Sequence, residues 1–305
     1  MKAIECKSLT KTYRRKKALS DFTVSIDENK IVGLVGRNGA GKTTFMKILA
    51  GLLKEQSGSV EVYGRRPFND LFVSANTIYI DDEMNFPAPL TLKEILEEGR
   101  RFYHNWDHEL AGRLFKYFGF HPKQRHNELS KGYESTFNMI IGLASRSPLT
   151  IFDEPTTGMD AAVRKDFYRA LLKDYLAHPR TILLSTHHLE EMEDVLEEIV
   201  LIDKGELYWQ MSMDELKEYS IGLAGKRDVL EPWVQNQEVF YTRETGVDDR
   251  YMVVENTFNE YERQQMQLAG IGLSAVSASD LCVYVTDEKG RKGGVDDVFD
   301  RSPDR

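Results

Sequence analysis

The chain has 305 residues, of which 41% are hydrophobic, and it carries a formal net charge of −9 at pH 7. This length allows one complete α/β core and a smaller second domain. The negative charge argues against nucleic acid as a partner, because binding to the phosphate backbone of DNA or RNA normally requires a basic protein face.

Cysteine content and hydropathy indicate the compartment. The only two cysteines, Cys6 and Cys282, lie nearly the whole chain apart and suggest neither a disulfide framework nor a metal cluster. No apolar run approaches the ~18 residues that a membrane-spanning helix needs, and the first residues lack the apolar stretch of a signal peptide. We therefore expect a soluble, cytoplasmic chain that reaches a membrane only through a partner.

The first predicted elements surround a glycine-rich loop. Short apolar runs at residues 3–6 and 22–26 precede the continuous run Ile31–Val35, which predicts a buried strand. The segment Gly36–Thr44 follows at once and satisfies the pattern G-x-x-x-x-G-K-[ST]. Helical spacing of apolar residues then continues to Leu53. A strand, a glycine loop and a helix in this order are the context that a phosphate-binding loop requires.

Each residue type in this loop suits phosphate binding. Glycines let successive backbone N–H groups point inward, and the N-terminus of the following helix adds its dipole. Lys42 is expected to bridge the outer phosphates, and Thr43 to supply a hydroxyl to Mg²⁺. The loop residues predicted to contact the ligand are Gly36, Asn38, Gly39, Ala40, Gly41, Lys42, Thr43 and Thr44.

The middle of the chain alternates predicted helices and strands. A helical, charge-rich insertion is expected from about residue 91 to residue 145, beginning with the capping box Thr91–Glu94. Buried strands are predicted at Leu149–Phe152, Thr181–Ser185 and Ile199–Ile202, with a helix over residues 161–176 and a second capping box at Ser212–Glu215.

Two acids follow the strand that ends at Phe152. A phosphate loop needs a carboxylate on the metal side and a group that activates water. Asp153 is predicted to hold Mg²⁺ directly or through water, and Glu154 to orient and polarise the attacking water.

Beyond residue 220 the strong patterning stops. Apolar runs at Val239–Phe240, Met252–Val254 and Leu281–Val285 predict short strands, so we expect a small α+β domain over residues 221–289. Residues 290–305 are predicted to be a disordered tail.

The motifs of residues 1–220 resemble, in unbroken order, the ATP-binding-cassette (ABC) ATPase family. The family's signature segment, usually L-S-G-G-Q, reads Leu129-Ser130-Lys131-Gly132-Tyr133 here. The resemblance implies a P-loop NTPase cassette with a RecA-like core, an antiparallel β subdomain and a helical subdomain over about residues 83–146. It also implies that this segment closes over the γ-phosphate of ATP held by a second subunit. Ser130 is suited to cap a helix and to donate to phosphate, and Gly132 to allow close backbone approach.

Further site residues follow from the same resemblance. Residues 156–160 resemble the family's D-loop, with Asp160 as the matching acid at the dimer interface. His187 matches the switch histidine that senses the γ-phosphate and helps to hold the attacking water. Tyr13 matches the aromatic residue that stacks on adenine, and Ala18 a small residue that contacts the base. The catalytic residues are therefore predicted to be Glu154, His187 and Lys42, with ATP and Mg²⁺ as cofactors.

One position departs from the family pattern. The family places a glutamine near Mg²⁺ and the attacking water, where this chain has Asp82. A carboxylate oxygen is a good Mg²⁺ ligand, but an ionised carboxylate cannot donate a hydrogen bond. The predicted metal ligands are therefore Thr43, Asp153 and Asp82.

Three short segments resemble a bacterial subgroup of exporter ATPases: Asn105–Asp107, the signature variant with lysine, and Val283–Thr286. This resemblance implies a motor subunit that dimerises head to tail with an identical or different cassette. It would drive a separate permease and attach through it to the inner face of the cell membrane. The alternatives are a soluble ABC ATPase that acts on ribosomes or DNA, and a nucleotide-dependent switch with little turnover.

Overall fold

The computed structural model describes residues 1–14, 16–186 and 189–286. The chain divides into two compact units, of which the first ends at Gln210 and the second begins at Met211. This division lies earlier in the chain than the boundary predicted after residue 220. The reason is helix α7 (Met213–Glu218), which packs against strand β10 (Ser220–Lys226) of the second unit and buries Met213 and Leu216.

A six-stranded sheet forms the centre of the first unit. Its strands, in spatial order, are β5 (Thr77–Ile80), β6 (Leu149–Asp153), β7 (Thr181–Ser185), β3 (Ile31–Val35), β8 (Glu198–Asp203) and β9 (Glu206–Ser212). Pairing from β5 to β8 is parallel, and every residue of β3, β6 and β7 is buried, as their continuous apolar runs predict. Loops that follow β3 and β6 therefore emerge at the same edge of the sheet.

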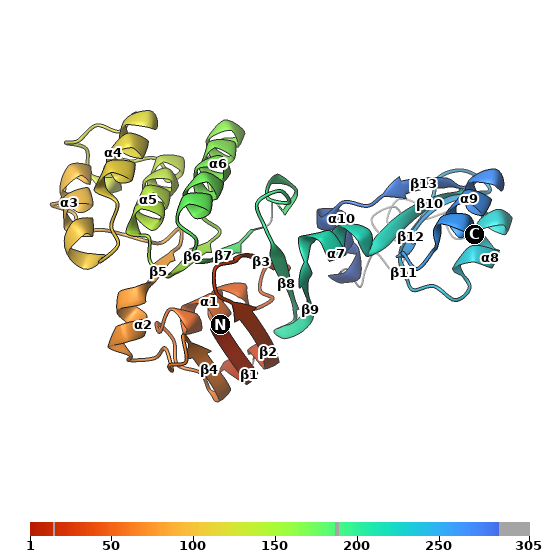
Figure 1. The fold of residues 1–305 in the computed structure, drawn as a ribbon, viewed down its shortest axis with the longest axis horizontal. Coiled ribbons are helices and arrows are strands. Elements are labelled where there is room, and N and C mark those ends of the chain that lie inside the picture. The colour runs from red at the N-terminus through yellow and green to blue at the C-terminus, as the bar shows by residue number, and fades with distance from the viewer. Residues whose placement is uncertain (15, 187–188, 287–305) are drawn as a thin grey trace, which may run out of the picture. The chain divides into compact units, whose positions relative to one another are not determined.

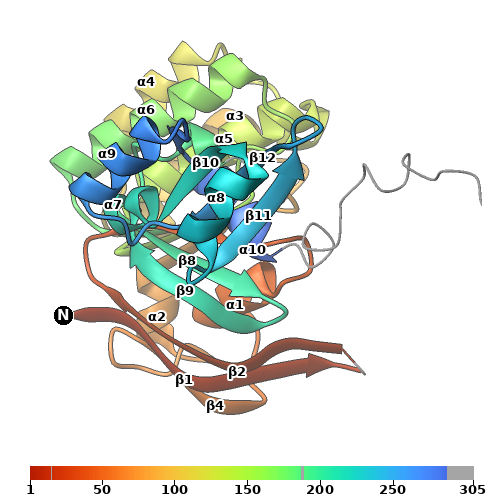
Figure 2. The ribbon, with the colours of Figure 1, turned by 90° about the vertical axis from the view of Figure 1, so that its right-hand side faces the viewer.

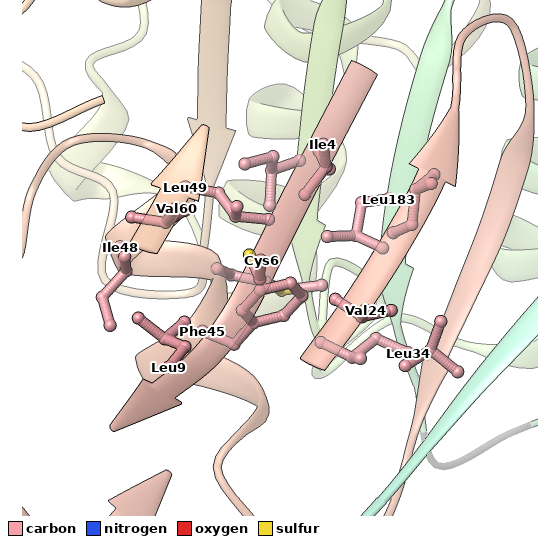
Figure 3. Packing of buried hydrophobic residues seen from close by; sticks show 14 of the residues in the cluster. Ile4, Cys6, Leu9, Val24, Leu34, Phe45, Ile48, Leu49, Val60 and Leu183 are labelled. Atoms are coloured by element: carbon pink, nitrogen blue, oxygen red, sulfur yellow. The ribbon is translucent and has the colours of Figure 1, made fainter. Parts of the chain in front are cut away.

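A smaller antiparallel sheet packs beside helix α1 (Lys42–Leu49). Strands β1 (Lys2–Tyr13), β2 (Lys16–Asp27) and β4 (Ser57–Val62) lie side by side in it (Figure 2). Phe45 of α1 contacts Phe22 of β2 with ring centroids 4.8 Å apart. Ile48 and Leu49 of α1 face the apolar side chains of β1 and β4 (Figure 3). This core fixes the helix that begins directly after the phosphate loop.

The remaining helices of the first unit include the predicted helical insertion, which Figure 1 shows as a group of neighbouring helices. The helices are α2 (Leu71–Asn76), α3 (Leu92–Phe102), α4 (His108–Tyr117), α5 (Lys131–Ser145) and α6 (Ala161–Ala177), with 3-10 turns η1 (His126–Glu128) and η2 (Leu189–Glu191). The capping box predicted at α3 is present, because Thr91 and Glu94 bond each other's backbone N–H groups.

The second unit has a split βαβ arrangement. After β10 come α8 (Arg227–Val234), β11 (Val239–Glu244), β12 (Asp249–Glu255), α9 (Glu260–Leu268), β13 (Gly272–Ala275) and α10 (Ala278–Thr286). The antiparallel sheet has the order β11-β12-β10-β13, which is that of a ferredoxin-like βαββαβ unit. Leu223, Val254 and Met266 contribute to its core.

One predicted strand in this unit is wrong. Residues Leu281–Val285 lie in helix α10. Its buried apolar residues, Ala278, Leu281, Cys282 and Val285, recur at separations of three and four positions, which is helical spacing. A short apolar run alone does not distinguish a strand from a buried helical face. The tail predicted for residues 290–305 lies outside the described residues.

Candidate nucleotide site

Three segments that are distant in sequence line one cavity of about 360 Å³. They are the junction of β1 and β2, the glycine loop before α1, and the residue after β6. The lining residues are Tyr13, Lys16, Ala18, Asn38, Gly39, Gly41, Lys42, Thr43, Thr44 and Glu154. The structure thus brings the aromatic residue, the phosphate loop and the predicted water-activating acid to one place.

Two glycines of the loop have backbone conformations that a side chain would disrupt. Gly36 has a φ of 150° and Gly41 a φ of 118°. A Cβ atom on Gly36 would lie 2.3 Å from the carbonyl oxygen of Ile202, and one on Gly41 would lie 2.4 Å from that of Ala18. The carbonyl groups of Ile202 and Ala18 therefore leave room only for glycine at these two positions of the loop. Gly36 and Ala40 of the loop are not among the residues that line the cavity.

Lys42 is held inside the loop. Only 6% of the residue is exposed, and its Nζ donates to the carbonyl oxygen of Gly36 at 2.7 Å. The same nitrogen lies 3.8 Å from Oε1 of Glu154. Burial lowers the pKa of Lys42, while the charges of Glu154 and Asp153 act in the opposite direction. The ammonium group is thus partly desolvated, which strengthens its attraction for an incoming phosphate.

Asp153 lies in a buried hydroxyl network whose other members come from neighbouring strands. Its Oδ1 accepts a hydrogen bond from Ser185 Oγ at 2.6 Å, and its Oδ2 accepts one from the Tyr79 hydroxyl at 2.9 Å. Burial, followed by the charge of Asp153, raises the pKa of Tyr79, so this hydroxyl stays protonated and donates. The Asp153 carboxylate and the Thr43 hydroxyl both offer oxygen atoms, which are the ligands that Mg²⁺ prefers.

Glu154 has a strained backbone. Its φ of 50° lies in the left-handed region, which non-glycine residues rarely adopt. Its N–H donates to Ser185 Oγ at 2.8 Å, and Thr157 Oγ1 donates to its carbonyl oxygen at 2.9 Å. These bonds hold a conformation in which the side chain reaches the cavity wall.

Ser185 therefore orients both acids, and Ser185→Ala is expected to lower ATP turnover about 10–100-fold, the usual effect of removing a partner of a ligating group. Steady-state hydrolysis at saturating Mg²⁺ measures the loss. Ser145→Ala is the matched control, since Ser145 is also fully buried but bonds only within α5 and the turn after it. Unchanged turnover in Ser185→Ala would show that Asp153 and Glu154 need no positioning by this hydroxyl.

The signature segment and the D-loop form a second surface, away from the cavity lining. A Cβ atom on Gly132 would lie 2.4 Å from the carbonyl oxygen of Gly158, so the two backbones are in direct contact. Ser130 occupies the N-cap position of α5 but makes no capping hydrogen bond with its side chain, contrary to the expected capping role. Its exposed hydroxyl remains available to a ligand from outside. Asp160 caps α6 by accepting from the N–H groups of residues 162 and 163 at 2.9 Å.

The Asp82 carboxylate is not part of the cavity lining. Its Oδ2 lies 3.7 Å from Nζ of Lys131, the lysine of the signature segment. The neighbouring Asp81 has a different partner, with its Oδ2 3.6 Å from Nζ of Lys47. The predicted contact of Asp82 with Mg²⁺ therefore stays a prediction.

Lys16, interpreted from its basic run as a surface residue, is exposed but also lines the cavity, and its Nζ would lie 3.1 Å from a Cβ atom on Gly39. Its basic run gives no signal of this position, because the phosphate loop that it meets lies in another segment. His187 lies outside the described residues.

Comparison with known proteins identifies the family. The family model for ABC transporters matches residues 19–157. The ABC transporter ATP-binding protein YtrB of Bacillus subtilis is 30% identical over 215 residues, which are 70% of this chain and 74% of YtrB. The chain belongs to the ABC transporter ATP-binding family. A second relative of this ABC ATPase is an uncharacterised ABC transporter ATP-binding protein, YdbJ of Bacillus subtilis, which is 28% identical over 294 residues and 93% of both chains.

A solved structure agrees with the ABC ATPase fold. The cassette MJ0796, solved as a dimer in a post-hydrolysis state with ADP and Pi, has a TM-score of 0.61 and 21% identity. The match covers 69% of this chain and 98% of that one. The predicted P-loop cassette fold is thus confirmed, and the chain is an ATPase of this family.

Proposed function

We propose that this ATPase is the motor of a bacterial exporter and works as a head-to-tail pair of cassettes that encloses two ATP molecules. The division of the site supports this proposal. Residues that suit ATP binding line the cavity, whereas the exposed residues of the signature segment and the D-loop, Ser130 and Asp160 among them, lie outside its lining. Each surface lacks what the other has, so a second cassette completes both.

Within one cassette, different residues are assigned to the base, the phosphates, the attacking water and Mg²⁺. Tyr13 and Ala18 offer adenine an aromatic face and an apolar contact. Lys42 neutralises the outer phosphates, and Glu154 orients water and accepts its proton. Thr43 and Asp153 would hold Mg²⁺, which supplies positive charge against the phosphate oxygens. His187 is assigned to the γ-phosphate by resemblance.

The permease is proposed as a separate polypeptide. Among the residues that the structure describes, no helix is long and apolar enough to cross a membrane. Segments Asn105–Asp107 and Val283–Thr286 support the exporter assignment through their resemblance to exporter ATPases. Affinity purification of the tagged chain from membranes of its source organism should recover a protein with several transmembrane helices. Recovery of ribosomes or DNA-binding proteins in its place would favour the soluble alternative.

The second unit is proposed to hold or regulate the dimer. It has its own core, built around Leu223, Leu230 and Met266. None of the residues that line the nucleotide cavity comes from it. The match to YdbJ, which covers 93% of both chains, extends into this part of the chain.

A chain that ends at Gln210 is expected to bind ATP with an affinity within about twofold of the full chain, because the cavity belongs to the first unit. Any dimer formed without nucleotide should weaken, which sedimentation velocity measures. A chain that ends at Ser220 is the matched comparison: it keeps α7 but loses most of β10, so Met213 and Leu216 would be exposed. Loss of ATP binding in the 1–210 chain would contradict this division of the molecule.

A further inference from the structure

Two positions at which the sequence departs from the family pattern meet in the structure. Asp82 stands where the family has glutamine, and Lys131 stands where the signature segment has its first glycine. Lys131 Nζ donates to the backbone carbonyl oxygen of Asp82 and lies 3.7 Å from its Oδ2. The same nitrogen lies 3.8 Å from Oε2 of Glu134.

This cluster belongs to the exposed signature surface. Lys131 directly follows Ser130 and is the first residue of α5. A Cβ atom on Gly158 of the D-loop would lie 3.3 Å from Lys131 Cγ, so the lysine stem runs along the D-loop. The ammonium group is therefore held within the surface that is proposed to meet the ATP of a second cassette.

The ion pair between Lys131 and Asp82 is too exposed to stabilise the fold appreciably. The side chains of Lys131 and Asp82 are 45% and 46% exposed. Solvent screens an ion pair of this exposure, so the pair contributes little to stability. A triphosphate, which carries several negative charges and accepts charge-assisted hydrogen bonds, would compete successfully for the same ammonium group.

We propose that Lys131 is a phosphate-binding residue of the composite site, which is the nucleotide cavity of one cassette together with the signature segment of the other. Without ATP, the Lys131 ammonium group pairs with the carboxylates of Asp82 and Glu134. ATP on a second cassette then replaces these carboxylates. This inference rests on the proposed head-to-tail dimer. Asp82 then acts as a competitor of ATP and not as a metal ligand. Its carboxylate competes with ATP for Lys131, and this competition sets the ATP concentration at which two cassettes associate.

The competition predicts effects of opposite sign. Asp82→Asn removes the competing charge, so less ATP should be needed for half-maximal dimerisation, by up to about fivefold. Lys131→Met removes a charged hydrogen-bond donor, so about tenfold more ATP should be needed. Lys131→Arg keeps the charge and should stay near the parent protein. The double variant, Asp82→Asn with Lys131→Met, should behave like Lys131→Met alone, because Asp82 affects ATP binding only through its ion pair with Lys131.

The test titrates ATP-Mg²⁺ into the full chain carrying Glu154→Gln, which slows hydrolysis, and follows mass by light scattering. Lys93→Met is the control, since Lys93 is an exposed lysine in the first turn of another helix, α3. Melting temperatures establish that each variant is folded. A separate Mg²⁺ titration at fixed ATP is expected to give the same curve for Asp82→Asn and its parent.

Three results would overturn the inference. The first is a Lys131→Met curve that coincides with that of the parent protein. The second is an effect of Asp82→Asn that persists without Lys131. The third is a shifted Mg²⁺ dependence in Asp82→Asn, which would make Asp82 a metal ligand. If the Glu154→Gln parent itself forms no ATP-dependent dimer, the head-to-tail proposal fails, and this inference fails with it.

Discussion

Glu154→Gln should bind ATP-Mg²⁺ but hydrolyse it about 10²–10⁴-fold more slowly, which is the usual contribution of a positioned general base. The amide keeps the shape of the side chain, so the strained backbone at this residue and its hydrogen bond to Ser185 should be retained. Because ATP then persists, the variant should accumulate as a dimer that depends on ATP.

Phosphate release measures turnover, and a fluorescent ATP analogue measures binding. Glu109→Gln is the control, because Glu109 is an exposed residue of α4 whose ion pair with Arg113 is also exposed. Turnover of Glu154→Gln near that of the parent protein would remove Glu154 from the proposed chemistry.

Lys42→Met should weaken ATP binding about 10–100-fold, since the variant loses a charged donor to the outer phosphates. The fold should survive this change. Methionine has a similar stem, and removal of a desolvated charge offsets loss of the hydrogen bond to Gly36. The free energy of unfolding is therefore expected to stay within about 1 kcal/mol of the parent value.

Isothermal titration with ATP-Mg²⁺ and a urea unfolding curve together check this prediction. Lys47→Met on the same helix is the control, because Lys47 faces Asp81 and Tyr79 and does not line the cavity. Unimpaired ATP affinity in Lys42→Met would mean that the loop binds nucleotide through its backbone alone.

Features encoded in a single short segment could be predicted from the sequence. The strand before Gly36, the loop and the start of α1 are contiguous, so their pattern is sufficient to place them. The buried strand before Asp153 is recognisable for the same reason. The family resemblance adds the order of these segments, from which the cassette fold follows.

Features made by contacts between segments could not be predicted in this way. Ser185 lies beside Asp153 because β6 and β7 pair in parallel with that register. Tyr79 reaches the same carboxylate from β5 on the other side of β6. Neither strand order nor register can be read from the hydrophobic pattern of one strand.

Side-chain direction accounts for the other differences. Lys16 belongs to a basic run typical of a surface turn, but the hairpin between β1 and β2 places it beside the phosphate loop. Asp82 occupies the position of a metal-site glutamine, but its carboxylate lies near Lys131. In both cases the residue type is visible in the sequence, and the partner that determines its role comes from another segment.

Cysteine cross-linking tests the composite site most directly. One preparation carries Asn38→Cys in the phosphate loop and the other carries Ser130→Cys in the signature segment, both with Glu154→Gln. The natural cysteines, Cys6 and Cys282, are buried, which keeps background reaction low. The head-to-tail account predicts a disulfide-linked dimer only in the mixture and only with ATP-Mg²⁺. Absence of that product in the mixture, or equal cross-linking without nucleotide, would contradict it.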